Sequence, residues 1–272
     1  MTSSFPHARP GTPAETRHRA ALCLAAFLAF LAWPASGQTQ PRFTLEGWYW
    51  RGDLEATALV NRGTLGTVFD FKRDLGMSDA GTPAGRFVLA LGPHSRLHFS
   101  YLDLSYRGDA TVERTIEFAG HTYTVGTRVV SSLGERYGRA GWVWQFVDVG
   151  DGAFRLGTVL DVVWLRLAAA LRAPDLQPPE QESDTLSGTL PALGLAVDAS
   201  PHRALDLFLE GSGVDAGSHG SLLDAEAGLR VFPTANLGVL AAYRVLDLRL
   251  NDRPDFAKVR VAGPYLGLSA RW

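Results

Sequence analysis

His98 and Ser100 stand two residues apart in a segment that alternates apolar and polar residues. Side chains two apart on a β-strand share a face, so an imidazole and a hydroxyl at this spacing can form the hydrogen bond that activates a serine nucleophile. Both residues come directly after a predicted turn at 92–95. The pair is therefore a candidate for acyl-transfer chemistry, with an ordinary strand position as the alternative.

Charged side chains recur on one face of several predicted strands, opposite an apolar face. Carboxylates and guanidinium groups that meet in a narrow interior pair with one another, because an isolated buried charge is costly. We predict that these side chains form ion pairs inside the protein, and a narrow polar conduit is the alternative. The predicted set is Glu46, Arg86, Arg139, Arg155, Asp161, Asp206, Glu210, Glu226, Arg230, Arg244 and Arg271.

The composition gives little support to metal, redox or nucleic-acid chemistry. The chain has one cysteine, Cys23, so we expect no disulfide framework and no cysteine metal site. The 26 basic and 28 acidic residues leave a net charge of −2, which lacks the basic excess of a nucleic-acid binder. We expect no cofactor, and the histidines after residue 37 are scattered: His94, His98, His121, His202 and His219.

The N-terminal segment has the order of a signal peptide. Arginines precede an apolar run at 20–31, and small residues, Ala35 and Gly37, follow at the two positions that a signal peptidase reads. The run is shorter than the about twenty residues that a spanning helix needs. We therefore predict a signal peptide at 1–37 and one barrel domain at 38–272.

A two-residue period runs through the chain after residue 37. Between 205 and 210, leucines alternate with Asp206, Phe208 and Glu210, and the period returns at 223–231. A soluble sandwich shows the same alternation, but strands near ten residues with a polar inner face favour a transmembrane β-barrel. The aromatic residues that we expect near strand ends or on the lipid-facing side are Trp48, Tyr49, Trp50, Tyr101, Tyr106, Tyr137, Trp142, Trp144, Trp164, Tyr243 and Tyr265.

Turn signals divide the chain into ten predicted antiparallel strands, with eight as the alternative. Short turns alternate with long connections, as in outer-membrane barrels, which places both termini in the periplasm. Within the long connections we expect a hairpin around 112–125 and a mobile, proline-rich loop at 173–184. The predicted strands are 42–51, 84–92, 95–107, 137–147, 153–169, 189–199, 203–211, 222–232, 236–249 and 258–272.

The last strand carries Gly267, Ala270 and the terminal aromatic Trp272. In this pattern the chain resembles the small outer-membrane β-barrel proteins of Gram-negative bacteria, whose last strand is read by the barrel-assembly machinery. Members usually end in Phe, so Trp272 is a departure. The resemblance implies a closed all-β barrel in the cell outer membrane, with the assembly machinery, lipid and lipopolysaccharide as partners. It leaves the activity and the oligomeric state open.

Two enzyme families of this membrane offer comparisons. Lipid A 3-O-deacylases carry a His, a Ser two residues on and then an Asn, but Tyr101 follows Ser100 here, and His98 lies by a periplasmic turn. Omptin proteases carry Asp-x-Asp and Asp-x-His pairs, and this sequence has neither.

Two Arg-Gly-Asp triplets, at 51–53 and 107–109, are predicted at outer strand ends and suggest adhesion only weakly, because arginines there also pair with lipid phosphates. We predict a non-enzymatic, structural or interaction barrel that works through its outer loops. A narrow, porin-like channel and a lipid A-modifying enzyme are the alternatives.

Overall fold

The computed structural model describes residues 41–59, 67–118, 121–150, 152–252 and 255–272. The predicted signal peptide, with Ala35 and Gly37, lies outside these residues. No helix in the described ranges is long and apolar enough to cross a membrane.

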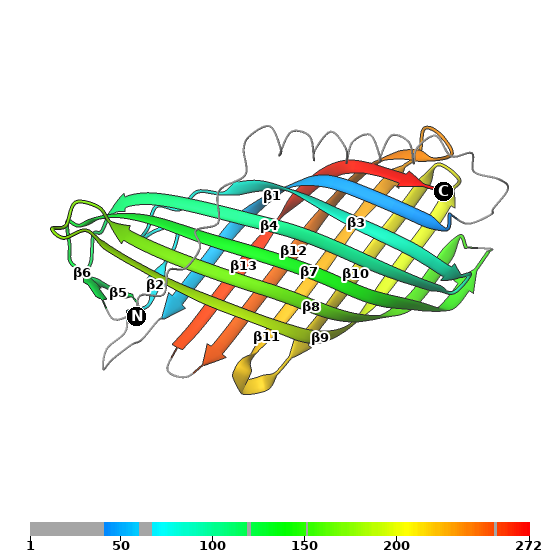
Figure 1. Ribbon diagram of the computed structural model, residues 1–272. Coiled ribbons are helices and arrows are strands. Elements are labelled where there is room, and N and C mark those ends of the chain that lie inside the picture. Colours follow the sequence, from blue (N-terminus) through cyan, green and yellow to red (C-terminus); the bar gives the residue numbers. More distant parts are fainter. Residues whose placement is uncertain (1–40, 60–66, 119–120, 151, 253–254) are drawn as a thin grey trace, which may run out of the picture. The chain divides into compact units, whose positions relative to one another are not determined.

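Ten antiparallel strands follow one another around a closed barrel (Figure 1), and the first strand pairs with the last. The fold is therefore the closed ten-stranded barrel predicted from the alternation. The barrel strands are β1 (Phe43–Leu59), β3 (Ala80–Gly92), β4 (Ser95–Thr111), β7 (Arg128–Val149), β8 (Phe154–Ala173), β9 (Glu180–His202), β10 (Leu205–Asp215), β11 (Gly220–Val231), β12 (Leu237–Asp252) and β13 (Asp255–Arg271).

Most strands extend well beyond their predicted outer ends. The predicted mobile loop at 173–184 is wrong: β8 continues to Ala173 and β9 begins at Glu180, so that the proline-rich turn occupies only 174–179. The added segment of β9 is polar on both faces, and it pairs residue by residue with β8. Backbone hydrogen bonds hold paired strands together in water as well as in lipid, so these extensions need no hydrophobic alternation. The alternation in the sequence therefore did not predict them.

Two small elements lie at the outer end of the barrel, where the long connections are. β5 (Ile116–Phe118) and β6 (His121–Tyr123) form the predicted hairpin, with Ile116 opposite Tyr123. β2 (Phe69–Asp70) adds to the outer end of β1. Loop residues then turn back into the barrel between β2 and β3.

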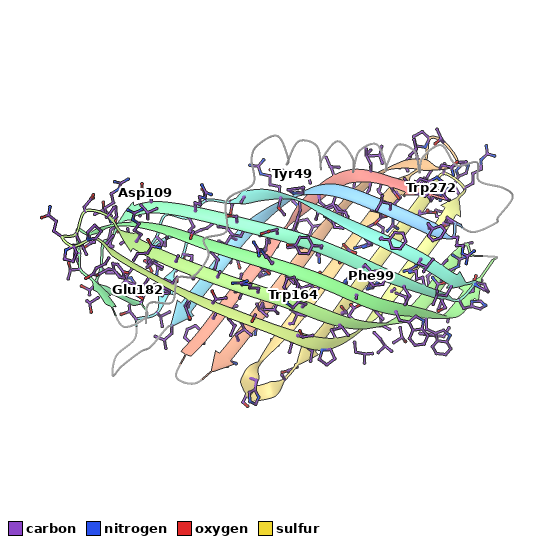
Figure 2. The ribbon with its side chains drawn as sticks, in the orientation of Figure 1. Tyr49, Phe99, Asp109, Trp164, Glu182 and Trp272 are labelled. Atoms are coloured by element: carbon purple, nitrogen blue, oxygen red, sulfur yellow. The ribbon has the colours of Figure 1, made fainter. Side chains whose placement is uncertain are left out.

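The outer surface carries a belt of exposed apolar side chains on the half of the barrel nearer the short turns (Figure 2). Beyond this belt, toward the long connections, the outward positions become charged or hydroxylic, as on β4 with Asp103, Ser105 and Arg107. The belt includes Tyr49, Phe99, Tyr101, Trp142, Trp144, Leu160, Val162, Trp164, Leu193, Leu195, Leu207, Leu209, Leu223, Leu229, Leu237, Val239, Tyr243, Leu266 and Leu268.

The aromatic residues divide between the two faces, which corrects the sequence prediction. The belt aromatics face outward as expected, whereas five others point into the barrel and are buried. Some inner aromatics have polar partners: Trp50 Nε1 donates to the carbonyl of Gly263 at 3.0 Å, and the Tyr137 hydroxyl donates to Asp224 at 2.8 Å. Trp48 Nε1 and the Tyr106 hydroxyl have no hydrogen-bond partner among the described residues. Residue type alone did not distinguish the outward-facing aromatic residues from the buried ones. The buried aromatics are Trp48, Trp50, Tyr106, Tyr137 and Tyr265.

The outer half of the interior is an apolar core rather than a water-filled space. Phe69, Phe71 and Leu75 enter it from the loop after β1, and the hairpin contributes Ile116 and Phe118. The Phe69 ring lies 5.0 Å from Phe71 and 5.9 Å from Phe118 between centroids. We call residues 67–79 and 112–127, within the described ranges, the cap, because they close the outer end over this core.

The final strand is held by close packing. A Cβ on Gly267 would lie 2.3 Å from the carbonyl oxygen of Gly47 and 2.5 Å from Cβ of Trp48, whose ring stacks on Tyr265. The pairing continues through Trp272, which exchanges backbone hydrogen bonds with Phe43 at 2.9 and 3.0 Å. Ala270 is buried. Gly267 therefore has a packing role that the terminal pattern did not reveal.

Candidate functional site

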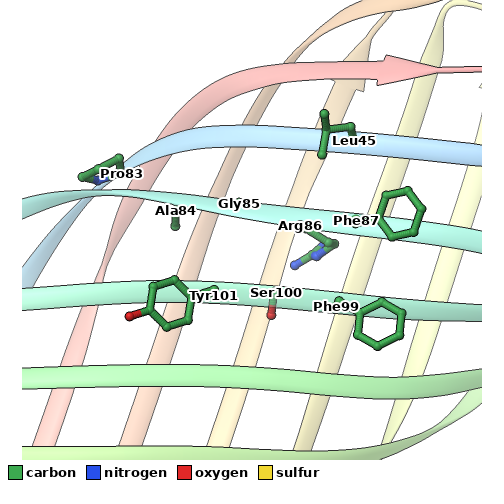
Figure 3. A pocket seen from close by; sticks show the side chains of 9 residues that line it. All are labelled: Leu45, Pro83, Ala84, Gly85, Arg86, Phe87, Phe99, Ser100 and Tyr101. Atoms are coloured by element: carbon green, nitrogen blue, oxygen red, sulfur yellow. The ribbon is translucent and has the colours of Figure 1, made fainter. Parts of the chain in front are cut away.

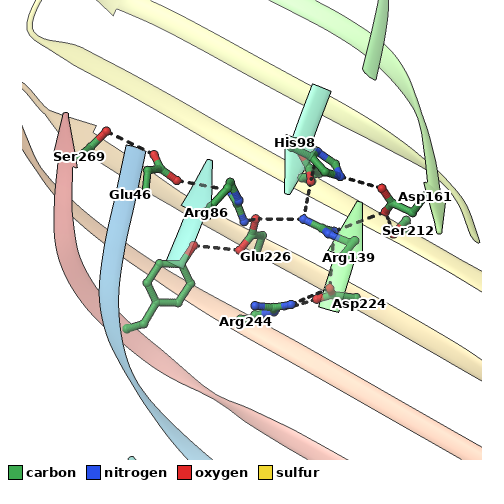
Figure 4. A network of polar contacts seen from close by, with 12 residues as sticks. Glu46, Arg86, His98, Arg139, Asp161, Ser212, Asp224, Glu226, Arg244 and Ser269 are labelled. Carbon is green, nitrogen blue, oxygen red and sulfur yellow. Dashed lines mark hydrogen bonds and ion pairs between the residues drawn. The ribbon is translucent and has the colours of Figure 1, made fainter. Parts of the chain in front are cut away.

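The inner half of the barrel nearer the short turns is filled with charge. Inward-facing carboxylates and guanidinium groups from nearly every strand meet there (Figure 4), because each strand presents alternate residues to the interior. We call this group the lumen network. Its centre is formed by Glu46 of β1, Arg86 of β3, His98 of β4, Arg139 of β7, Asp161 of β8, Glu210 of β10, Asp224 and Glu226 of β11, and Arg244 of β12.

Arg139 is the hub of the network. Its Nη2 donates to Glu210 at 2.7 Å, and its Nη1 lies 3.5 Å from Asp224 and 3.6 Å from Asp161. Asp224 also accepts from Nη2 of Arg244 at 2.7 Å. One guanidinium group thus contacts carboxylates from three strands, and two of these strands, β10 and β11, lie across the barrel from β7.

A second set of pairs continues the network toward β1. Arg86 pairs with Glu226, and its Nη1 lies 3.5 Å from Glu46. Arg230 donates to Glu46 from the other side, and the Tyr265 hydroxyl donates to Glu226 at 2.9 Å. Each of these carboxylates has a cationic partner in the low-dielectric interior, which is the condition under which buried charge is tolerated.

His98 and Ser100 do not form the activated pair considered from their spacing. His98 Nε2 lies 2.7 Å from Asp161 Oδ1, and Asp161 also accepts from Ser212 at 2.5 Å. Ser100 Oγ has no hydrogen-bond partner among the described residues. His98 and Ser100 are buried, only 1% and 8% exposed, although Ser100 is among the residues that line a pocket on the outer wall. The imidazole therefore serves the ion-pair network.

The remaining predicted charges lie toward the short-turn end and are partly exposed. Arg155 Nε lies 3.2 Å from Asp148, and Arg271 Nη1 lies 3.2 Å from Asp206. The structure thus brings most of the predicted set into one network and places Arg155, Asp206 and Arg271 in separate pairs at its edge.

Sequence reasoning missed several members of the network. Asp224 was the most visible of these, because it stands on the same face of β11 as Glu226 and Arg230. Arg96, which pairs with Asp198 at 2.7 Å, follows a turn too closely for its direction to be predicted. Glu135, a further buried carboxylate outside the network, lies in the outer extension of β7, beyond the predicted strand.

The Arg-Gly-Asp triplets lie within paired strands rather than in exposed turns. Residues 51–53 are in the middle of β1, and residues 107–109 are in β4. Asp53 pairs with Lys72, and Asp109 pairs with Arg128 at 2.6 Å. Glycine is required at the centre of the second triplet, since a Cβ on Gly108 would lie 2.1 Å from the carbonyl oxygen of Leu75.

A pocket of 520 Å³ lies on the belt between β1, β3 and β4 (Figure 3). It forms where Gly85 and its cross-strand neighbour Gly47 leave no side chain outside the barrel. Phe87, Phe99 and Tyr101 border it. Across the described ranges, no group of three or more His, Cys, Asp or Glu residues is arranged to hold a metal ion.

Comparison with protein-family models and with curated proteins finds no match. Among solved structures, the outer membrane protease OmpT from Escherichia coli has a TM-score of 0.58 at 9% identity, over 88% of this chain and 99% of that one. The attachment invasion locus protein Ail of Yersinia pestis gives a TM-score of 0.37 at 12% identity, over 86% of this chain and 100% of that one. At these identities the likeness to OmpT shows the fold of an outer-membrane barrel.

Proposed function

We propose that this protein is an outer-membrane β-barrel with a closed lumen, and that it works through its outer end rather than by conduction or catalysis. The apolar belt supports the membrane location, because it covers the wall at the height where hydrocarbon would contact it. Insertion would require the assembly machinery and would bring lipid and lipopolysaccharide into contact with the wall.

The main support for a closed lumen is that two layers of side chains fill it. The lumen network occupies the inner half with paired charges, and the apolar core and cap occupy the outer half. A hydrated ion passing through would have to break pairs such as Arg139 with Glu210 and then cross a layer lined mainly by apolar side chains, with Glu135 and Ser131 as buried polar exceptions. Barrels of about this strand number are commonly filled by their own side chains.

Catalysis is not favoured by the site geometry. The paired His98 and the buried Ser100 lack the contact that a nucleophile needs. In the part of the chain that the structure describes, this pair therefore does not support a lipid A-modifying activity. The protease neighbour shares the fold, and its activity is not transferred by a fold alone.

Planar-bilayer recording of the refolded full chain tests the closed lumen. We expect no steady current from the wild type and intermittent current from an R86A/R139A variant, in which two of the central side chains are removed. Current from that variant would show that the recording detects inserted protein. Stepwise current from the wild type at the level of the variant would overturn the proposal and support the narrow channel.

A further inference from the structure

The outer wall formed by β4, β7, β8 and β9 changes character abruptly from one row of residues to the next. Strand register defines the rows, since residues that pair across neighbouring strands stand side by side. The last row of the belt places Tyr101 opposite Gly138, Gly138 opposite Trp164, and Trp164 opposite Thr189. The Trp164 ring lies against Gly138, where a Cβ would be 3.2 Å from the ring.

The next row outward contains two arginines directly opposite each other. Its order is Asp103, Arg136, Arg166 and Ser187. Like charges at directly opposed positions repel, and such a pair destabilises a sheet unless an anion is present. Arg136 Nε lies 3.3 Å from Asp103, but Arg166, which is exposed, has no ion-pair partner among the described residues. The row therefore carries two guanidinium groups but only one carboxylate.

The two rows beyond the arginines contain mostly small or hydroxyl-bearing residues. A flat, polar group can lie on this surface without meeting a bulky side chain, and the hydroxyls offer hydrogen bonds to it. Figure 2 shows this part of the wall between the labelled residues Trp164 and Asp109. The residues are Ser105, Gly134, Ala168 and Thr185, then Arg107, Ser132, Ala170 and Ser183.

The opposite wall carries carboxylates between its opposed cations and the belt. There the row that crosses β12, β13 and β1 reads Asp247, Arg260 and Glu55, so the signs alternate. Arg260 Nη1 lies 3.4 Å from Glu55, and Arg249 Nε lies 3.3 Å from Asp247. In the next row outward, Arg249 stands directly opposite Lys258, which has no ion-pair partner among the described residues. The two walls therefore differ in where their opposed cations lie, because on β7 and β8 these cations follow the belt directly.

We propose that Arg136 and Arg166 bind a phosphate group of a phosphorylated glycolipid in the outer leaflet. Arginine binds phosphate through paired, charge-assisted hydrogen bonds, and two guanidinium groups side by side match one dianionic group. The acyl chains lie along the belt below Trp164, with the pocket beside Tyr101 as room for one chain. The sugars lie on the small residues above. The inference rests on the proposed membrane location.

The test compares lipid A that carries its phosphates with the same lipid A after phosphatase treatment. Binding of each to the refolded full chain in neutral detergent micelles is measured by native mass spectrometry. We expect the wild type to bind the phosphorylated form about tenfold more tightly or better, equivalent to about 1.4 kcal/mol. The variant R136Q/R166Q should bind both forms equally. The control R249Q/R260Q removes the same charge from the opposite wall and should keep the preference.

Each other result counts against the inference. If R136Q/R166Q keeps the preference for phosphorylated lipid A, or if the control loses it equally, the proposed site is refuted. Competition by millimolar inorganic phosphate alone, dependent on the same arginines, would assign the site to free phosphate instead of lipid. Flotation with lipid vesicles separates the two proposals: protein that inserts without the preference refutes only this site, and protein that fails to insert refutes the membrane location.

Discussion

Arg139 shows how a single side chain can hold a barrel closed. It faces Glu210, Asp224 and Asp161 at once, so its removal leaves several buried carboxylates without their shared cation. Breaking a buried ion pair from one side costs much more than its formation contributes, because the remaining charge is stranded in a low dielectric. The interior therefore contains buried charges that are costly when unpaired. Strands far apart in the sequence must supply the oppositely charged partners.

We predict that Arg139→Ala lowers the free energy of unfolding by about 3–5 kcal/mol. Arg128→Ala, at the exposed pair with Asp109, should cost less than about 1 kcal/mol. Urea unfolding of the refolded proteins in lipid vesicles measures both. A loss at Arg139 no larger than that at Arg128 would mean that the interior is hydrated and the network is not a plug.

Gly267 is a residue whose role depends on its neighbours rather than on its place near the terminus. We predict that Gly267→Ala destabilises the barrel by about 1–3 kcal/mol, because the new methyl group meets the backbone of β1. Gly47→Ala is the control, since a Cβ there meets nothing within 4 Å. Refolding into vesicles without any assembly machinery measures the effect. Normal stability of G267A in that assay would leave recognition during assembly as its only role.

At the scale of elements, the two segments of the cap are joined by a polar contact at Asp74. Arg114 of the hairpin segment and Arg73 both donate to its carboxylate, and the amide of Asp70 donates at 2.8 Å. Burial acts to raise the pKa of Asp74, but these hydrogen bonds outweigh it and lower the pKa to about 2. Two segments of the cap, far apart in sequence, therefore share one charge.

The lowered pKa makes the cap sensitive to acid. Because the folded pKa lies below the unfolded value near 4, the stabilisation is present above pH 4 and is lost as the pH falls toward 2. We predict that pepsin cuts residues 67–79 readily at pH 2 and slowly at pH 4. Asp74→Asn weakens the contact by about 1–3 kcal/mol and should make cleavage similar at both pH values. If the variant keeps the wild-type difference, another group controls the cap.

The strands and their order could be predicted from the sequence where apolar and polar residues alternate, as a wall that faces lipid requires. Within the belt, segments such as 205–210 alternate strictly, and the register follows. In the outer extension of β9, polar residues occupy both faces, so its length was not visible. The pairing partners inside the barrel were also hidden: the sequence shows that Arg139 faces inward, but not that Glu210 and Asp224 meet it across the barrel.

At the scale of the whole molecule, the proposed membrane location divides the barrel by height into a membrane half and a water half. On β8 the boundary falls between Trp164 and Arg166, which are consecutive outward residues. Inside the barrel, the lumen network lies within the half that carries the belt, and most of the apolar core lies within the other half. The interior is therefore mainly polar where the outside is apolar, and mainly apolar where the outside is polar.

This division predicts chemical accessibility along the wall. In chains carrying Cys23→Ser and reconstituted in lipid nanodiscs, Ser183→Cys should react quickly with a charged maleimide, because it stands three rows above the Trp164 row. Val162→Cys, one row below Trp164, should be protected, since a charged reagent does not enter hydrocarbon. After unfolding in urea both cysteines should react equally. Val162 is exposed on the protein surface in the absence of lipid. Equal reactivity in nanodiscs would therefore place the belt in water and refute the membrane half of the molecule, whereas protection of both would place the boundary farther out than Arg166.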